Sequence, residues 1–481
     1  MKKNYFRLLA VLFAAIVSGG LVSCGDDDEK DNGGQGGTVT PVTPEEPSKD
    51  EAMSSADQKE YLEKVALDFM SMMPASDFND ISELAEYIRD TYGDNYDWRA
   101  VEVWADEALD AAREALGGQT TESKTETWGS STYKYNYVYT NYRALIMASN
   151  FTGHFTARNG RWVQEDASDL QFIFSDNRGQ QCVIKLETSG SRKNVHVAED
   201  DSWDDYEYNS SGNTYTSTSY YDRTQFIVAV PERIVVTLTQ AGREVVKTTV
   251  NINLASISGE EFNIRSNSLT ASTLVELNNG YKFDVQNVAY TANSKAAVSF
   301  VMSKNGTALV TLAVASDVRD IPSVNVSAFS ARSFDADDYD FDKANAKNAY
   351  VKLDLIGKVQ IQGTVSDVRK LVDYMEEAHG NRSNESTFKS YVNQANSLAD
   401  VGLFYEGKAV KQATARMEPF VEEAWNGRTY WEAKPVICFF DGTSYSTLEV
   451  FFNEKDFKAT IDAFKSLANR YANLVGERIY W

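Results

Sequence analysis

Residues 295–316 read KAAVSFVMSKNGTALVTLAVAS, two apolar runs joined by Asn305-Gly306. Asn-Gly adopts the positive φ angles that a tight hairpin turn needs, so this stretch predicts a β-hairpin. Both runs are apolar at successive positions, which indicates a part of a sheet that is covered on both faces. The hairpin therefore predicts a sandwich or a curved sheet capped by helices.

Turn signals of the same kind recur on the N-terminal side of this hairpin. They are RNGR at 158–161, DNRGQ at 176–180, QAGRE at 240–244 and NNGY at 278–281. The runs RIVVTLT (233–239) and EVVKTTVNI (244–252) form a second convincing hairpin pattern. We predict an antiparallel β meander over residues 128–334.

Helical patterns flank the meander on both sides. Residues 54–118 predict amphipathic helices, with Ser55 and Gln58 as a capping box at the first helix. An acidic segment, 335–348, looks like a junction, and 349–481 mixes strands with helices. The last predicted helix carries an apolar stripe: Phe457, Ile461, Phe464, Leu467, Tyr471 and Leu474. The predicted fold class is α+β, with a helical cap, a central meander and a C-terminal α+β unit.

The start of the chain has the parts of an export signal. Lys2, Lys3 and Arg7 precede a short apolar run, and residues 21–24 read LVSC. This motif resembles the lipobox of bacterial lipoproteins, which implies a signal peptide over 1–23 and lipidation of Cys24. A soluble exported protein with a chance cysteine is the alternative.

The residues after Cys24 read GDDDEKD and continue into a Gly- and Pro-rich stretch, so 24–53 predicts a lipidated, disordered tether. The acidic run resembles the export tag of Bacteroidota-type surface lipoproteins. Together with FTARNGRWVQED, VAVPERIVVTLTQAG and LIGKVQIQG, it makes the chain resemble an uncharacterised family of such lipoproteins. The resemblance implies an outer-membrane location facing the cell exterior, with the periplasmic leaflet as alternative, and transfers no catalytic residue.

The composition of the chain limits the classes of partner that it can bind. The 481 residues carry a formal net charge of −23, which opposes binding to phosphate backbones, so we expect no nucleic-acid partner. The expected membrane contact is the N-terminal lipid. Cys182 and Cys438 could pair in an oxidising envelope, or simply lie buried in their apolar strands.

Motifs for catalysis or cofactors are weak. The three histidines, His154, His196 and His379, lack metal-ligand spacing, so we expect no metal and no cofactor. DADDYDFD at 335–342 lacks the Gly and Glu of a calcium loop and is interpreted as an acidic linker. Residues 131–134 match the SxxK motif of penicillin-recognising serine enzymes, in which the serine and the lysine lie on a helix. Here the two residues fall in a predicted alternating strand, so no catalytic residue is assigned.

Aromatic residues are the more informative feature. The stretch STYKYNYVYT places four tyrosines on one face of a strand: Tyr133, Tyr135, Tyr137 and Tyr139. A second cluster lies among aspartates: Trp203, Tyr206 and Tyr208. Aromatic rings with nearby hydroxyl or carboxylate groups suit stacking on sugars. For the tyrosine stripe, the alternative is packing against a neighbouring layer of the fold. For the second cluster, the alternative is a mobile acidic insertion.

The sequence thus favours a surface-anchored, non-catalytic binding protein for a glycan or another nutrient. A structural or adhesive envelope-assembly protein is the second hypothesis. A hydrolase without a visible motif is the third.

Overall fold

The computed structural model describes residues 53–93, 96–128, 131–202, 214–255, 257–330, 338–423, 428–440 and 446–447, and the single positions 462, 465 and 469. The fold class is α+β, as predicted. The helices are α2 (Ser55–Met72), η1 (Ala75–Phe78), α3 (Asn79–Tyr92), α4 (Arg99–Ala111), η2 (Ala148–Asn150), α5 (Val326–Ser330), η4 (Phe341–Lys343), α6 (Val368–Gly380) and α7 (Glu385–Asn396). Within the described ranges, no helix is long and apolar enough to cross a membrane.

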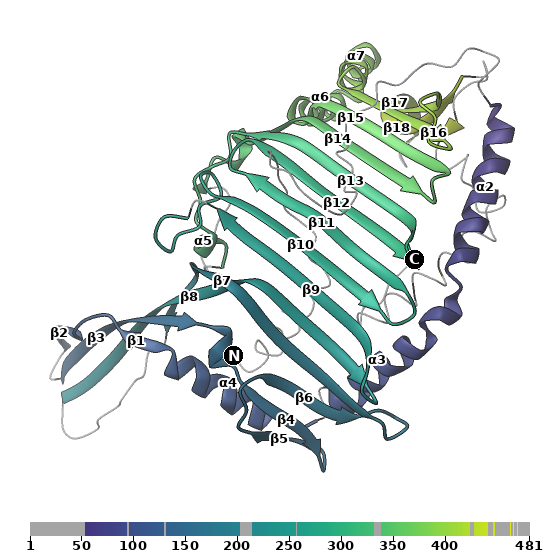
Figure 1. The fold of residues 1–481 in the computed structure, drawn as a ribbon. Coiled ribbons are helices and arrows are strands. Elements are labelled where there is room, and N and C mark those ends of the chain that lie inside the picture. The colour runs from purple at the N-terminus through teal and green to yellow at the C-terminus, as the bar shows by residue number, and fades with distance from the viewer. Residues whose placement is uncertain are drawn as a thin grey trace.

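All strands of the described residues join one sheet (Figure 1). The first are β1 (Arg113–Ala115), β2 (Thr120–Trp128), β3 (Ser131–Ile146), β4 (Gly153–Arg158), β5 (Arg161–Glu165), β6 (Leu170–Ser175), β7 (Gln181–Ser202), β8 (Thr214–Gln240) and β9 (Arg243–Ala255). The others are β10 (Ser268–Leu277), β11 (Tyr281–Thr291), β12 (Lys295–Lys304), β13 (Thr307–Arg319), β14 (Asn345–Leu355), β15 (Val359–Asp367), β16 (Ala399–Tyr405), β17 (Lys411–Glu423), β18 (Thr429–Phe439) and β19 (Ser446–Thr447).

From β6 to β19 each strand pairs antiparallel with the next, which confirms the meander. Each predicted turn lies between two consecutive strands, as expected. Asn305 and Gly306, with φ of 51° and 82°, join β12 to β13 as a tight turn with two positive φ angles. Because all these strands belong to one sheet, the fold is the sheet capped by helices rather than the sandwich.

The acidic segment 335–348, predicted as a junction, includes the start of β14. β14 pairs directly with β13, so the sheet continues past this segment. Leu312 pairs with Leu353, and the sheet then runs on through β15 to β19 without a break. The predicted C-terminal α+β unit therefore extends the same sheet, with α6 and α7 inserted between β15 and β16.

The long strand β8 joins two parts of the sheet. β7 pairs with one edge of β8, while β3 and β9 pair with successive segments of the other edge, β3 in parallel and β9 antiparallel. The segment with β3 carries β1 and β2 as well, and it projects from the body as the wing at the lower left of Figure 1.

The N-terminal helices lie along one end of the meander, where α2 and α3 cross the hairpin ends of successive strands (Figure 1). Val65 of α2 packs against Val359 and Tyr405, near the turns of β14–β15 and β16–β17. Farther along, Met73 and Phe78 pack against a second cluster: Tyr281, Met302 and Leu309. A third cluster joins α3 and α4 to β4–β7 through aromatic rings, including Tyr92, Trp104, Phe155, Trp162 and Phe172.

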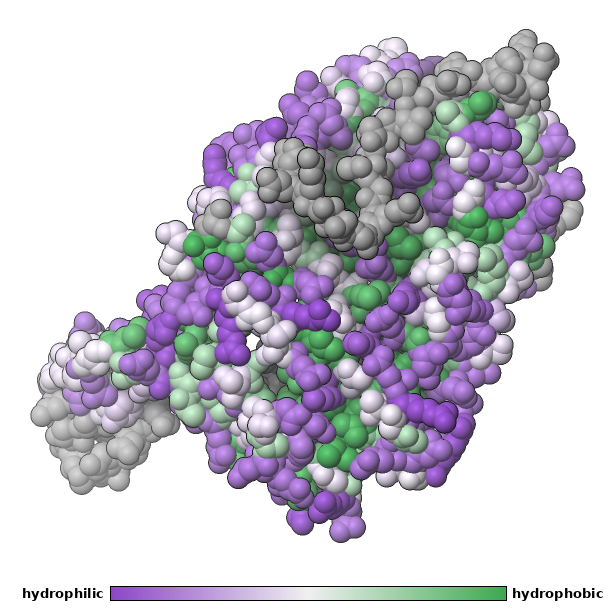
Figure 2. Space-filling view, in the orientation of Figure 1, coloured by the Kyte–Doolittle hydropathy of each residue, from purple (hydrophilic) through white to green (hydrophobic). Residues whose placement is uncertain are grey.

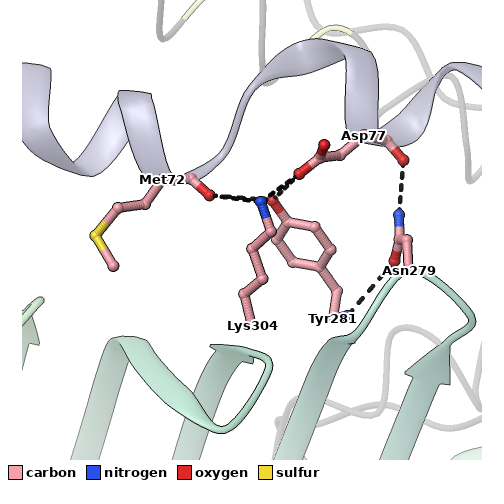
Figure 3. A network of polar contacts seen from close by, with 5 residues as sticks. All are labelled: Met72, Asp77, Asn279, Tyr281 and Lys304. Carbon is pink, nitrogen blue, oxygen red and sulfur yellow. Dashed lines mark hydrogen bonds and ion pairs between the residues drawn. The ribbon is translucent and has the colours of Figure 1, made fainter.

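A polar clasp fixes η1 to two hairpins (Figure 3). The Asp77 carboxylate accepts hydrogen bonds from Lys304 Nζ at 2.6 Å and from Tyr281 OH at 2.7 Å. Asn279 Nδ2 donates to the Asp77 carbonyl at 2.6 Å, and Lys304 Nζ also reaches the Met72 carbonyl at 3.1 Å. One turn of chain thus holds the ends of β11 and β12.

The predicted capping box at α2 is wrong. Ser54 is the N-cap, and its side chain accepts from the amide of Asp57. Gln58 is instead fully buried: its amide nitrogen donates to the carbonyl of Gln412 at 2.9 Å, and its oxygen accepts from Tyr405 OH at 2.9 Å. A side chain expected to cap a helix therefore binds that helix to the β16–β17 hairpin.

Candidate functional site

The tyrosine stripe lies on β3, in the wing. Cross-strand register places Tyr139 of β3 directly opposite Tyr221 of β8, and Tyr137 opposite Ser219. Residues that are directly opposite share a face of the sheet, so these side chains form one surface. We call the surface made by Tyr135, Tyr137, Tyr139 and Tyr221 the tyrosine face.

Three of these rings pack on one another. Tyr139 and Tyr221 stack with centroids 5.1 Å apart and 17° between planes, and Tyr137 lies 6.1 Å from Tyr221 at 32°. The stack covers Ser219, which is 5 % exposed, yet 36 % of Tyr139 remains accessible. Tyr133 also lies in β3, opposite Tyr215, but its side chain is outside the described residues.

Each face of the wing combines a buried and an exposed side chain. Val138, between Tyr137 and Tyr139 in sequence, points to the opposite face and is only 7 % exposed. Its neighbour on that face, Tyr220 of β8, is 44 % exposed. Both faces of the wing are therefore partly open, and the tyrosine face differs in carrying the packed rings.

Charged side chains continue the tyrosine face toward the body. Two residues beyond Tyr221, Arg223 donates to Glu199, which lies on the same face of β7. Arg143 of β3, opposite Gln225 and four residues beyond Tyr139, forms an ion pair with Glu260 from the β9–β10 connection. Both pairs neutralise charge on this face, and carboxylate and guanidinium groups can exchange hydrogen bonds with hydroxyl groups.

His196 lies beyond these pairs, opposite Ile227 on the same face. Its Nδ1 lies 2.9 Å from Glu261, and its backbone amide donates to the carbonyl of Glu260 at 2.7 Å. His196 is 8 % exposed, and its Nε2 has no partner in the described part of the chain. His196 fixes the β9–β10 connection against β7, as a buried structural histidine does.

A recess of about 400 Å³ opens at this end of β7, lined by Glu199, Asn263, Asn325 and Tyr339 among others. Asn263 Nδ2 donates to Ser323 Oγ at 3.0 Å and to Asn325 Oδ1 at 2.9 Å, which sets the shape of the wall. The recess presents amide, hydroxyl and carboxylate groups beside one tyrosine. Such a lining suits a polar, hydroxyl-rich ligand better than an apolar one.

Several predicted site residues fall outside this surface. Cys24 and the aromatic cluster of Trp203, Tyr206 and Tyr208 lie outside the described residues. That cluster belongs to the connection between β7 and β8, which leaves β7 after Ser202 and enters β8 at Thr214.

The two later cysteines do not form the disulfide that the sequence left open. Both are free thiols, and strands β8 to β17 lie between Cys182 on β7 and Cys438 on β18. Cys182 is fully buried, and this burial raises the pKa of its thiol to about 11. Burial also raises the pKa of Cys438. Both cysteines are therefore packing residues.

Tyr221, Arg223 and Glu199 belong to no motif of the sequence that predicts a site. Residues 219–223 read SYYDR, so the alternation that puts Tyr221 and Arg223 on one face is visible there. What the sequence does not contain is the parallel pairing of β3 with β8, which brings two distant tyrosine segments together.

No group of three or more His, Cys, Asp or Glu residues within the described ranges is arranged to hold a metal ion. No family model matches the chain, and neither a curated protein nor a solved structure matches it.

Proposed function

We propose that this chain is a lipid-anchored, surface-exposed, non-catalytic binding protein whose ligand is a glycan. The observation that carries the proposal is the tyrosine face: Tyr137, Tyr139 and Tyr221 pack together, and Tyr139 keeps 36 % of its surface exposed. Aromatic rings offer flat apolar surface for the C–H faces of sugars, and tyrosine hydroxyls add polar contacts at the rim.

The polar groups beyond the rings support the same ligand class. Sugars need donors and acceptors next to the stacking surface, and Arg223 with Glu199 supplies both, within reach of Tyr221. The recess lined by Asn263, Asn325 and Tyr339 extends this polar region. A chain of several sugar units could lie on the rings and place one end among these side chains.

The N-terminal sequence supports the proposed location. LVSC at 21–24, the acidic run and the stalk before residue 54 would hold the folded part away from the membrane. Replacing Cys24 with Ser should then release the chain from membranes, and protease added to intact cells should cleave the wild-type protein. A membrane-bound Cys24→Ser chain would contradict the anchor.

The binding function is tested by affinity electrophoresis of the purified full chain with Cys24→Ser through gels that contain neutral or acidic polysaccharides. Retardation by at least one polysaccharide is expected. Unchanged mobility against every polysaccharide would contradict the proposal, whereas the polysaccharide that retards the chain identifies the sugar class.

A further inference from the structure

The strand β2 leaves one edge of the wing open. It pairs with β3 along one side, and among the described residues no strand pairs with its other side. Every side chain from Thr120 to Thr125 is exposed. The strand contains no proline, so each of its residues keeps a backbone N–H and C=O for a ladder. An open edge strand of this kind is a template for pairing with a further strand.

The wing also stands apart from the bulk of the molecule. In the space-filling view it projects at the lower left, as it does in the ribbon view (Figures 1 and 2). Strands within the meander are paired on both sides, whereas β2 lies at the edge of a projecting part of the sheet. A partner that adds a strand is therefore expected at β2.

The charged side chains of β2 alternate in sign on one face. Register places Glu122 opposite Tyr137 and Lys124 opposite Tyr135, so both continue the tyrosine face onto β2. Lys124 also forms an ion pair with Glu126 at 2.5 Å. A lysine on an edge strand normally blocks pairing, because an incoming strand would leave its charge without a partner. An incoming strand with a carboxylate at the matching position removes that obstacle.

A second copy of β2 supplies that carboxylate. With Ser123 of one copy opposite Ser123 of the other in antiparallel pairing, Glu122 of each copy lies opposite Lys124 of the other. On the other face of the strand, Thr121 lies opposite Thr125. Opposite charges and paired hydroxyl groups both stabilise directly opposed positions in antiparallel strands. The strand is therefore complementary to itself on both faces.

The charges also select this register over its neighbours. A pairing centred on Lys124 would oppose the two lysines and would place Glu122 against Glu126, so all these contacts would be repulsive. A pairing centred on Thr125 would need Glu126 for its charged contacts, but Glu126 is half-buried within its own chain. The pairing centred on Ser123 uses exposed charges alone.

We propose that β2 is the contact of a symmetric dimer, in which two wings pair antiparallel with Ser123 at the centre. The two-fold axis is then perpendicular to the sheet, so both tyrosine faces lie on the same side of one continuous sheet. At about 4.8 Å per strand, the two β3 strands are about 14 Å apart, with Glu122 and Lys124 of both copies between them. The dimer depends on β2 and not on glycan binding.

Sedimentation velocity of the full chain with Cys24→Ser tests the proposal without any glycan. One pair of strands buries less than the roughly 800 Å² per partner of a standard interface, so we expect a reversible dimer whose fraction rises with protein concentration. Lys124→Glu should raise the Kd of the dimer about tenfold, because two attractive pairs become repulsive. The exchange Glu122→Lys/Lys124→Glu should restore the dimer. The matched control, Lys408→Glu, makes the same charge change at a side chain that is 70 % exposed, and it should dimerise as the parent does.

Disulfide trapping tests the register independently. In the same chain with Cys438→Ala, Ser123→Cys should form a disulfide between two copies on oxidation, since directly opposite Cβ atoms lie about 4.5–5.5 Å apart. Thr121→Cys should not, because the residue opposite it is Thr125.

Three results would each overturn the proposal. The first is a monomer at every concentration. The second is a dimer whose Kd is the same with Lys124→Glu as with the parent. The third is equal crosslinking through Ser123→Cys and Thr121→Cys. A failure of glycan binding would change none of these measurements.

Discussion

Tyr139 and Tyr221 stack at 5.1 Å although they belong to separate segments of the sequence. The contact exists because β3 and β8 pair in parallel, a pairing that the rest of the meander does not use among its consecutive strands. It converts an alternating tyrosine pattern on one strand into a surface two strands wide. The proposed glycan site depends on that pairing.

Replacing Asp77 with Asn should destabilise the fold. The substitution weakens the bonds from Lys304 and Tyr281 and leaves Lys304, whose side chain is only 25 % exposed, without its ion-pair partner. Losing charged hydrogen bonds of this kind costs about 1–3 kcal/mol. Urea unfolding at pH 7 measures the change, with Asp80→Asn, at an exposed position of α3, as the control. Equal losses in both variants would show that the clasp adds no stability.

The contribution of Asp77 should also depend on pH. Burial raises the pKa of its carboxyl group, but the bonds from Lys304 and Tyr281 outweigh burial and hold that pKa below its ordinary value. A lowered folded-state pKa stabilises the protein above the unfolded pKa of about 3.9, and this stabilisation is lost as the pH falls through the folded-state value. The stability difference between wild type and Asp77→Asn should therefore shrink below about pH 4. A difference that stays constant from pH 7 to pH 3 would contradict this mechanism.

Gln58→Leu should lower the free energy of unfolding more than the similar sizes of the two side chains suggest. The leucine fits a buried site but leaves Tyr405 OH and the Gln412 carbonyl without their bonds from Gln58. Each unsatisfied buried group costs about 1–3 kcal/mol, so we expect the two groups together to cost about 2–6 kcal/mol. The midpoint of urea unfolding reports it, and exposed Glu60→Gln on the same helix should change little. A neutral Gln58→Leu would mean that packing alone holds α2.

Cys182 should be unreactive in the folded protein. Its pKa of about 11 leaves little thiolate at pH 8, and its side chain is fully buried. DTNB should label Cys182 only after the protein is unfolded in urea. Rapid labelling of Cys182 without denaturant, or a Cys182–Cys438 disulfide on a non-reducing gel, would disagree with the fold.

The sequence predicted the local parts of the fold well and the distant contacts poorly. Asn305-Gly306 determines its own turn through backbone conformation, so the hairpins were predictable. The sequence neighbours of Gln58 indicate a helix cap, whereas its partners Tyr405 and Gln412 come from the far end of the chain.

In the candidate site, too, the local pattern was predictable and the distant contact was not. Alternation put Tyr135, Tyr137 and Tyr139 on one face, which β3 retains. The addition of Tyr221 required the parallel pairing of two strands separated by β4–β7, and no periodicity in the sequence encodes which strand becomes the neighbour.

Glycan binding by the tyrosine face is the central claim, and one comparison tests it most directly. The full chain with Cys24→Ser is titrated by calorimetry with the polysaccharide that retards it in gels, next to Tyr139→Ala/Tyr221→Ala and next to Tyr220→Ala. Tyr220 is exposed on the same strand but on the opposite face. Loss of two stacking rings should weaken binding by about 1–3 kcal/mol, because each aromatic contact contributes about 0.5–1.5 kcal/mol beyond its buried area. We predict that the double variant loses measurable binding while Tyr220→Ala binds as the parent does; equal affinities of all three proteins would contradict the account.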